Sequence, residues 1–329
     1  QYSRAPPPPP AAPPLPHPPA PDPTAARRFA IQAHNPRNPA SIHRDDDNLA
    51  PRLRYSTLLP QGLEVEPLLA EAKAQLHTEA DYECEATALK EFAGHLADDM
   101  RFDVPEVVDA LTTEQVLCMQ FLDGQPVESL AEAPSAERNA AAVALVELAL
   151  REVFEWGLVQ TDPNFANYLY DAHSKRIQLL DFGATRQYAP QFRERLRDLL
   201  RACVDGSEED VTSCATAVGY TDPSDPPGYR KSVNALLRAA TEPARVEGDY
   251  AFARSDLAVR MKDLLVQMRA RDRYARMPPP QVLFLHRKLG GLYLLLNRLR
   301  ASIPVGELVI QALADSPQRE PPHIARLAV

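Results

Sequence analysis

Two polar motifs, separated by two short strand-like runs, most restrict the folds that this sequence can adopt. Asp162 and Asn167 stand five residues apart, and Asp181 opens an Asp-Phe-Gly tripeptide further along. Between the motifs, apolar residues at 167–170 and 176–180 predict two strands, joined by a polar turn. Such a hairpin returns the chain to its starting point, so we expect Asp181 to lie beside Asp162 and Asn167.

The segments on either side predict an α+β fold in which helices dominate. Helices are expected where Ala, Leu, Glu and Lys accumulate or where apolar residues follow one face, at 64–97 and 135–156. Short strands are expected at 104–108 and 115–119. After residue 183 the pattern is helical to the end of the chain, with breaks at the proline-rich loops 222–227 and 278–280. Strands clustered around the polar motifs, followed by helices, suit an α+β fold with a mainly helical large lobe.

Composition excludes several classes of protein. The first 24 residues contain 12 prolines, which favours an extended, disordered segment over helix or sheet; a polyproline ligand is the alternative. The net charge of −9 argues against a general nucleic-acid binder. Four scattered cysteines indicate reduced packing residues, and no apolar run is long enough to predict a membrane span. The first residue is Gln1, so we expect a processed chain or a fragment of a longer one.

The residue types of the two motifs fit phosphoryl transfer. Mg²⁺ ions that bridge nucleotide phosphates bind oxygen ligands. In protein kinases the Asp of a D-x-x-x-x-N loop works near the transferring group, while its Asn and the Asp of Asp-Phe-Gly hold metal. Asp162, Asn167 and Asp181 match this pattern. The alternative is a pair of turn carboxylates that cap helices.

At this point the sequence resembles a known group, the UbiB family of atypical kinases. The resemblance extends from about residue 29 to about residue 308, and it rests on five segments: 59–63, 79–86, 161–164, 181–186 and 285–291. It implies a protein-kinase-like fold with a mostly helical C-lobe and a reduced N-lobe. The expected division is a Pro-rich disordered segment at 1–28, a residual N-lobe at 29–124 and a C-lobe at 125–329.

The resemblance also implies roles for individual residues. Asp162 would be the catalytic-loop Asp, Asn167 and Asp181 would hold Mg²⁺, and ATP or ADP would be the nucleotide. Glu85 would be the helix Glu that pairs with the nucleotide-binding lysine, and Glu79 and Asp81 the acidic pair that restrains access to the site. From spacing alone, Asp81 and Glu85 share one face of a helix, which is also what a solvated acidic face would give.

The small lobe departs from the family pattern. The strand 29–32 fits the family's lysine strand, but the lysine position is Gln32. A neutral amide cannot pair ionically with Glu85 or with phosphates, and we expect the loss to weaken nucleotide binding by roughly 1.5–3 kcal/mol. Proline stands where the phosphate loop is expected, and no K-x-G-Q motif precedes it. A degenerate homologue, a truncated product and a replacement of the lysine by another residue all remain open.

Three functions compete on these grounds, and whether the chain is an enzyme stays open. The first is a Mg²⁺-dependent ATPase or atypical kinase-like protein that supports coenzyme Q (ubiquinone) biosynthesis. The second is a catalytically inactive pseudokinase scaffold, which Gln32 favours, and the third is small-molecule phosphotransfer of the aminoglycoside-kinase type. The resemblance implies coenzyme Q biosynthesis enzymes or lipid intermediates as partners, with peripheral membrane contact. It places the protein in mitochondria, on the matrix side of the inner membrane, with a plastid as the alternative.

Overall fold

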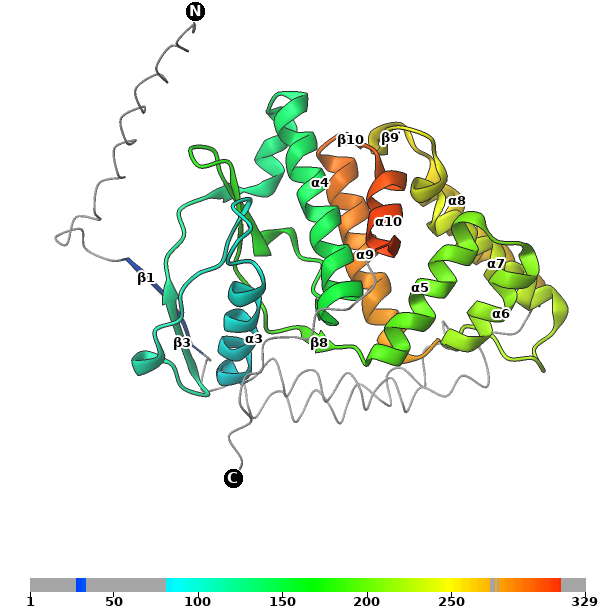
Figure 1. Cartoon of the computed structure of the whole chain (residues 1–329), viewed down its shortest axis with the longest axis horizontal. Helices are drawn as coiled ribbons and strands as arrows, with labels where there is room; N and C mark the ends of the chain where they lie inside the picture. The colour runs from blue at the N-terminus through cyan, green and yellow to red at the C-terminus, as the bar shows by residue number, and fades with distance from the viewer. Residues whose placement is uncertain (1–27, 34–80, 273–275, 277, 315–329) are drawn as a thin grey trace, which may run out of the picture.

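The N-terminal part of the fold is a two-stranded sheet beside one helix. The structure, a computed structural model, describes residues 28–33, 81–272, 276 and 278–314. Strand β1 (Phe29–Ala33) pairs antiparallel with β3 (Val116–Gln120). Helix α3 (Tyr82–His95) lies next to this pair, at the left of Figure 1.

Four short strands form a second sheet between the N-terminal part and the helices. Its order is β2 (Phe102–Asp103), β7 (Arg176–Leu179), β6 (Tyr168–Asp171) and β4 (Gln125–Pro126). Strands β6 and β7 are antiparallel neighbours in the chain, with Tyr168 opposite Leu179. A separate antiparallel pair joins β5 (Leu158–Gln160) to β8 (Thr185–Gln187). Hairpin β6–β7 therefore sits between the two strands of this pair in the sequence.

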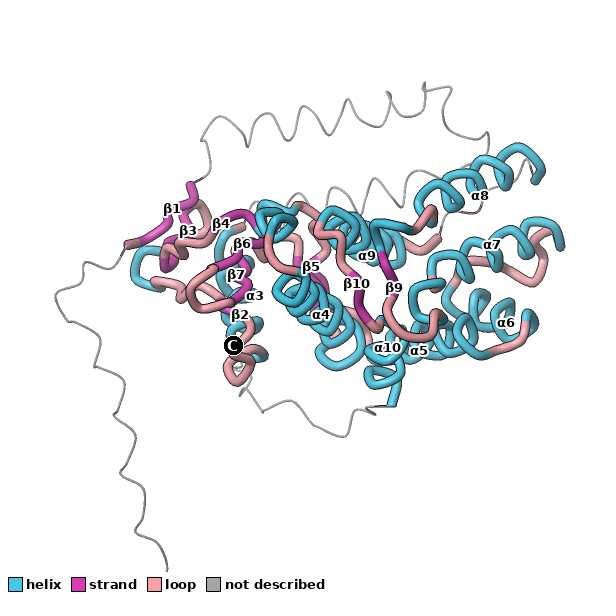
Figure 2. Tube along the Cα trace, turned by 90° about the horizontal axis from the view of Figure 1, so that it is seen from above, coloured by secondary structure: helices cyan, strands magenta, loops and turns pink. Residues whose placement is uncertain are grey.

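The rest of the described chain is helical. The long helices are α4 (Ser135–Arg151), continued by a π-helical turn (Glu152–Trp156), α5 (Pro190–Asp205), α6 (Glu208–Val218), α7 (Pro227–Ala240), α8 (Leu257–Asp272), α9 (Pro280–Arg298) and α10 (Val305–Ala314). Short 3₁₀ turns and one small strand pair complete it: Asp109–Leu111, Val127–Glu132, Phe165–Asn167, Glu242–Arg245, Phe252–Arg254, β9 (Tyr250–Ala251) and β10 (Ser302–Ile303). Both views place β1 and β3 at one end of the molecule and α6, α7 and α8 at the other (Figures 1 and 2).

One hydrophobic cluster joins the N-terminal part to the four-stranded sheet and to helices α4 and α9. It contains Leu89 of α3, Leu117 of β3, Leu145 of α4, Ile177 of β7 and Leu295 of α9, all almost completely buried. Burial of large aliphatic side chains is the main stabilising contribution in such a cluster. The cluster therefore crosses the boundary at residues 124 and 125 that the sequence predicts between two lobes.

The predicted elements agree with most of the structure. The helix at 135–156, the strand at 115–119 and the hairpin before Asp181 are confirmed, and β1 begins at Phe29 as expected. The strand predicted at 104–108 is wrong: only Val107 forms an isolated bridge, to Met119, and Pro105 cannot donate to a ladder. Residues 1–27 and 64–80, where a disordered segment and the start of a helix are expected, lie outside the described residues. Within the described chain, no helix has the length and apolar character needed to cross a bilayer.

Candidate active site

The loop that carries Asp162 and the turn that carries Asp181 are held together by backbone hydrogen bonds. The Asp162 loop (residues 161–167) leaves β5, and the Asp-Phe-Gly turn leads into β8, which pairs with β5. The backbone N–H and the hydroxyl of Thr161 both donate to the carbonyl of Ala184, at 3.1 and 2.7 Å. At the other end of the loop, the N–H of Leu180 donates to the carbonyl of Asn167 at 3.0 Å. The predicted convergence of Asp162 and Asp181 is thus built from sheet pairing at one end and a hairpin at the other.

Asp162 and Asn167 contact each other directly. Asn167 Nδ2 donates to Asp162 Oδ2 at 2.8 Å, and Asn167 is buried. The side chain of Asn164 caps the short 3₁₀ turn Phe165–Asn167 by accepting from the N–H of Ala166 at 3.1 Å. This turn orients Asn167 back toward Asp162. Its amide nitrogen faces the carboxylate, so Oδ1 is the atom through which Asn167 would bind a metal ion.

Asp181 is a half-buried carboxyl within a group of acidic side chains. Burial raises its pKa, the N–H of Gly183 at 2.9 Å lowers it, the charge of Asp162 raises it, and a hydrogen bond to Glu85 lowers it. Two carboxyl groups share a hydrogen bond only when one of them is protonated. The site therefore concentrates negative charge that a bound cation would neutralise.

Glu85 reaches this group from helix α3. It is 5% exposed, and its Oε1 accepts from the N–H of Phe182 at 3.3 Å. A Cβ atom built on Gly183 would lie 3.4 Å from Glu85 Oε2, so the turn passes close to the carboxylate. Phe182 itself is buried against Phe92 of α3, with ring centroids 4.6 Å apart. The structure thus brings together Glu85, Asp162, Asn167 and Asp181, as the sequence predicts.

The oxygen ligands of this site fit a magnesium ion shared with a nucleotide. Within the described residues, no three His, Cys, Asp or Glu side chains are arranged to hold a metal by themselves. Mg²⁺ commonly takes one or two carboxylates and completes its shell with phosphate oxygens and water. Asp181 and Asn167, with Asp162 beside them, supply oxygen donors of this kind.

Gln32 lies on β1, opposite Leu117 of β3, and is half-buried. Ala30, on the same face of β1, packs against the cluster that also contains Ala86, the neighbour of Glu85. Strand β1 and helix α3 therefore border one region, as the lysine strand and the Glu helix of a kinase do. The side chain at the lysine position is nevertheless a neutral amide, so it provides no charge for a phosphate.

The acidic pair predicted at Glu79 and Asp81 is described only in part, because Glu79 lies outside the described residues. Asp81 is the N-cap of α3: its Oδ1 accepts from the N–H groups of Glu83 and Cys84, at 2.9 and 3.4 Å. The side chains of Asp81 and Glu85 accordingly serve different purposes, one at the helix end and the other inside the site.

Sequence reasoning missed three charged residues at the site. Arg287 of α9 places Nη2 3.6 Å from Asp162 Oδ1. Its neighbour Lys288 forms a buried ion pair with Glu152, at 2.8 Å, beneath the same loop. The available signal was the presence of charged residues among the apolar residues of two helical segments, around Leu148–Val153 and Leu285–Leu289. His286, in the same motif at 285–291, stacks on Tyr220, and its Nε2 lies 2.6 Å from the Tyr220 hydroxyl.

Comparison with known proteins identifies relatives of the kinase type that the site geometry resembles. Residues 25–215 match the model of the "ABC1 atypical kinase-like domain". The chain is 32% identical over 293 residues to "Atypical kinase coq-8, mitochondrial" of Caenorhabditis elegans. It is 35% identical over 280 residues to "Atypical kinase COQ8B, mitochondrial" of Rattus norvegicus, and 31% over 297 residues to "Atypical kinase COQ8, mitochondrial" of Saccharomyces cerevisiae.

These matches cover most of this chain but only part of the relatives. They include 86%, 85% and 88% of the chain and 38%, 52% and 58% of the worm, rat and yeast proteins. Among solved structures, that of Rv3197 with erythromycin, from Mycobacterium tuberculosis, superposes with a TM-score of 0.66 over 87% of this chain and 71% of the other. At 21% identity this likeness concerns the fold, which is kinase-like and mixes helices with small sheets.

Proposed function

Since this chain belongs to the ABC1 atypical kinase-like family, we propose that it is a Mg²⁺-dependent, ATP-binding atypical kinase-like protein that supports coenzyme Q biosynthesis. The observation that carries the proposal is the meeting of Asp162, Asn167 and Asp181, enforced by the β5–β8 pair and the hydrogen bond from Leu180 to Asn167. Family membership implies nucleotide binding, and the oxygen donors at this place supply what the metal ion needs.

Each residue has a proposed part in the chemistry. Asp181 and Asn167 hold Mg²⁺, which when bound neutralises charge on the nucleotide phosphates. Asp162 orients the group that attacks, and its contact with Asn167 fixes the direction of its carboxylate. Glu85 holds the Asp-Phe-Gly turn through the N–H of Phe182. Asp81 and Glu79 form an acidic pair that restrains access, and Gln32 borders the phosphates without a charge.

A catalytically inactive scaffold is the less favoured alternative. The relatives are named as atypical kinases, and Asn167 and Asp181, which we propose as metal ligands, lie with Asp162 at one site. The loss of the lysine at Gln32 lowers affinity for the nucleotide but leaves the metal ligands in place. We therefore propose weak nucleotide binding that depends on Mg²⁺, with residues 29–124 as a reduced N-lobe and 125–329 as the C-lobe.

The relatives with these names are mitochondrial proteins, which agrees with the location that the resemblance implies. We propose that this chain acts at the matrix side of the inner membrane, beside enzymes or lipid intermediates of the coenzyme Q pathway. The chain spans about half the length of the curated relatives that it matches, so partners are proposed for this part of the protein alone.

Thermal unfolding of the purified chain with ATP or ADP, with and without Mg²⁺, tests the proposal. We expect Mg²⁺ and nucleotide together to raise the melting temperature, and Asp181→Asn to remove that rise. Asp198→Asn is a matched control, because Asp198 is an exposed carboxylate on α5. No shift at millimolar nucleotide, or an equal shift in Asp181→Asn, would contradict the proposal.

A further inference from the structure

Lys288 and Glu152 form an ion pair in the interior of the protein. Lys288 Nζ lies 2.8 and 3.0 Å from the two carboxylate oxygens of Glu152. Their side chains are 5% and 1% exposed. Burial raises the pKa of Glu152 and, taken alone, lowers that of Lys288; the adjacent carboxylate outweighs this and keeps the pKa of Lys288 raised, so the lysine stays protonated.

This pair contacts both ends of the Asp162 loop. On one side, Glu152 Oε2 accepts from the N–H of Gln160 at 3.0 Å, just before the loop begins. On the other side, Lys288 Nζ lies 3.4 Å from the hydroxyl of Tyr168, just after the loop ends. The loop is therefore fixed at its entrance and at its exit by two charges that neutralise each other.

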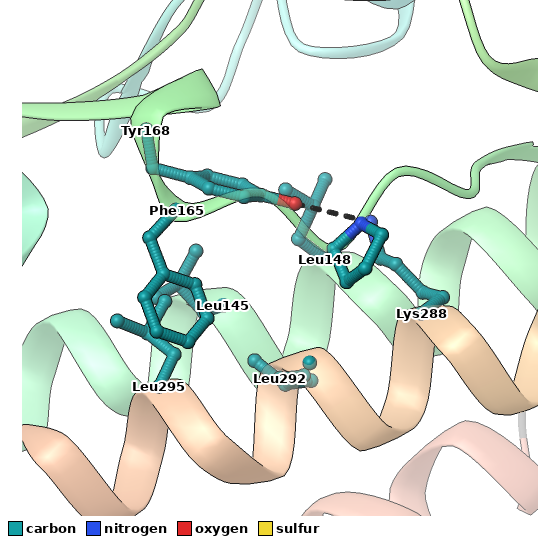
Figure 3. A pocket seen from close by; sticks show the side chains of 9 residues that line it. Leu145, Leu148, Phe165, Tyr168, Lys288, Leu292 and Leu295 are labelled. Carbon is teal, nitrogen blue, oxygen red and sulfur yellow. Dashed lines mark hydrogen bonds between the residues drawn. The ribbon is translucent and has the colours of Figure 1, made fainter.

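The surroundings of Lys288 exclude a direct contact with substrate. Figure 3 shows Tyr168 pointing at Lys288 across a small apolar cavity between α4, α9 and the Asp162 loop. The cavity has a volume of about 10 Å³, which is the room needed by one water molecule. A nucleotide or lipid cannot enter it, so the lysine does not act as a phosphate-binding cation.

Stability alone gives little reason to bury these charges. Removing two charges from water costs free energy that their attraction only partly offsets, and apolar side chains of similar volume often replace such a pair without loss. The pair adds directional hydrogen bonds, one to the backbone of Gln160 and one to the side chain of Tyr168. Apolar substitutes would fill the same space but hold neither end of the loop.

We propose that the Lys288–Glu152 pair is a positioning device for the Asp162 loop, with Lys288 and Glu152 as positioning residues that set the separation of Gln160 and Tyr168. The proposal rests on the proposed function for its consequence, because Asp162 and Asn167 act only when the loop is held in place. Helix α9, distant in the sequence, thereby controls the geometry of the metal ligands.

Backbone hydrogen exchange of the full chain tests the proposal without needing enzyme activity. In Glu152→Leu/Lys288→Met, which leaves no unpaired charge, we expect amides of 160–168 to exchange on the order of tenfold faster, relative to those of β7. The matched control removes another pair with a buried acidic partner, Asp225 and Arg276, as Asp225→Leu/Arg276→Met. That control leaves the ratio between 160–168 and β7 as in the wild type.

Two outcomes would overturn the positioning role: unchanged exchange at 160–168, or an increase equal to that at β7. Tyr168→Phe gives a milder second variant, which removes only the hydroxyl at 3.4 Å and speeds exchange at the exit of the loop. Where the wild type hydrolyses ATP, kcat/KM falls in the double variant, because the loop carries both Asp162 and the proposed metal ligand Asn167. A wild type that does not hydrolyse ATP would contradict the proposed function alone, because backbone hydrogen exchange would still test the positioning role.

Discussion

At Asp181, burial and a neighbouring negative charge both oppose ionisation of the carboxyl group. Burial raises its pKa above the ordinary 3.8, and the negative charge of Asp162 acts in the same direction. A raised pKa in the folded state means that this group favours folding below its ordinary pKa and that the contribution is lost as the pH rises through the raised value. If Mg²⁺ binds the ionised carboxylate as proposed, we expect the metal to restore stability over the same pH window.

The stabilisation by Mg²⁺ and nucleotide is therefore expected to grow with pH. Melting temperatures measured with and without Mg²⁺ should diverge as the pH rises above about 4, because the pKa of Asp181 is raised and its carboxyl loses its proton above its ordinary range. In Asp181→Asn the divergence disappears. A constant difference across this range would show that Asp181 does not hold the metal.

Restoring the lysine at position 32 gives a gain-of-function prediction. Gln32→Lys is expected to tighten nucleotide binding by about ten- to a hundredfold, because a charge-assisted contact contributes roughly 1.5–3 kcal/mol. Isothermal titration with ADP and Mg²⁺ measures the change. Gln115→Lys, at an exposed position just before β3, controls for the added charge. Equal affinities in both variants would mean that β1 does not face the phosphates.

At the scale of single residues, the sequence predicted the residues that share a short stretch of chain. Asp162, Asn167 and Asp181 fall in or beside one hairpin, so their convergence follows from local pairing. Lys288 and Glu152 are 136 residues apart, and no local pattern states which charges in two apolar helices will meet. Pairing at this distance depends on how α9 packs against α4, which spacing alone does not determine.

Among the elements, α9 packs tightly against the Asp162 loop at Gly291. A Cβ atom at Gly291 would lie 2.3 Å from Cβ and 3.0 Å from Cα of Pro163. The proline ring and backbone cannot yield as a flexible side chain would. At Gly290, by contrast, no atom lies within 4 Å of such a Cβ. Adjacent glycines of one helix thus differ in what a methyl group would meet.

Gly291→Ala is accordingly expected to destabilise the protein by about 1–3 kcal/mol and to displace Pro163. Gly290→Ala is expected to stabilise it by about 0.5–1 kcal/mol, through the better helix propensity of alanine. Urea unfolding measures both values, and nucleotide binding should fall only in Gly291→Ala. Equal effects of the two substitutions would contradict the close contact.

Two substitutions at Asp81, the N-cap of α3, separate its role as a helix cap from a role of its charge. Asp81→Ala is expected to cost about 1 kcal/mol of stability, whereas Asp81→Asn retains the cap because asparagine accepts the same hydrogen bonds. If the charge restrains access to the site, Asp81→Asn binds nucleotide faster without losing stability. Stopped-flow binding and urea unfolding distinguish the two effects. Equal stability losses in both variants would contradict capping by Asp81.

Element boundaries were predictable where composition and periodicity agree. The helix at 135–156 and the strand at 115–119 have one consistent pattern each, and both are present. The segment at 104–108 is apolar enough for a strand, but Pro105 interrupts its ladder and leaves a single bridge at Val107. Strands β9 and β10, with two residues each, are too short for any periodic pattern to indicate.

For the molecule as a whole, the sole tryptophan reports on the contact between α3 and the helical part. Trp156 lies in the π-helical turn after α4, with its ring stacked on His95 at 4.6 Å and edge-on to Phe92 at 5.8 Å. Because α3, β3, α4 and α9 share one hydrophobic cluster, we expect them to unfold together. Tryptophan fluorescence and far-UV circular dichroism should give one coincident transition in urea. An earlier transition in fluorescence would show that α3 separates first.

The fold class was predictable from two motifs and the order of helices and strands, whereas the packing of the lobes was not. The predicted boundary between 124 and 125 comes from the family resemblance. The cluster around Leu89, Leu117, Leu145 and Leu295 contains residues from both sides of this boundary. Apolar side chains bury against whichever element lies nearest in space.

This shared cluster has a consequence for how a ligand enters and leaves. A hinge that swung α3 and β3 away from α4 and α9 would expose Leu89, Phe92, Leu117 and Leu145 to water, at a free-energy cost of about 1.5–3 kcal/mol for each side chain. A clamshell motion of the two halves is therefore expensive in this protein. If the chain binds nucleotide as proposed, we expect exchange to proceed by movement of loops around this frame.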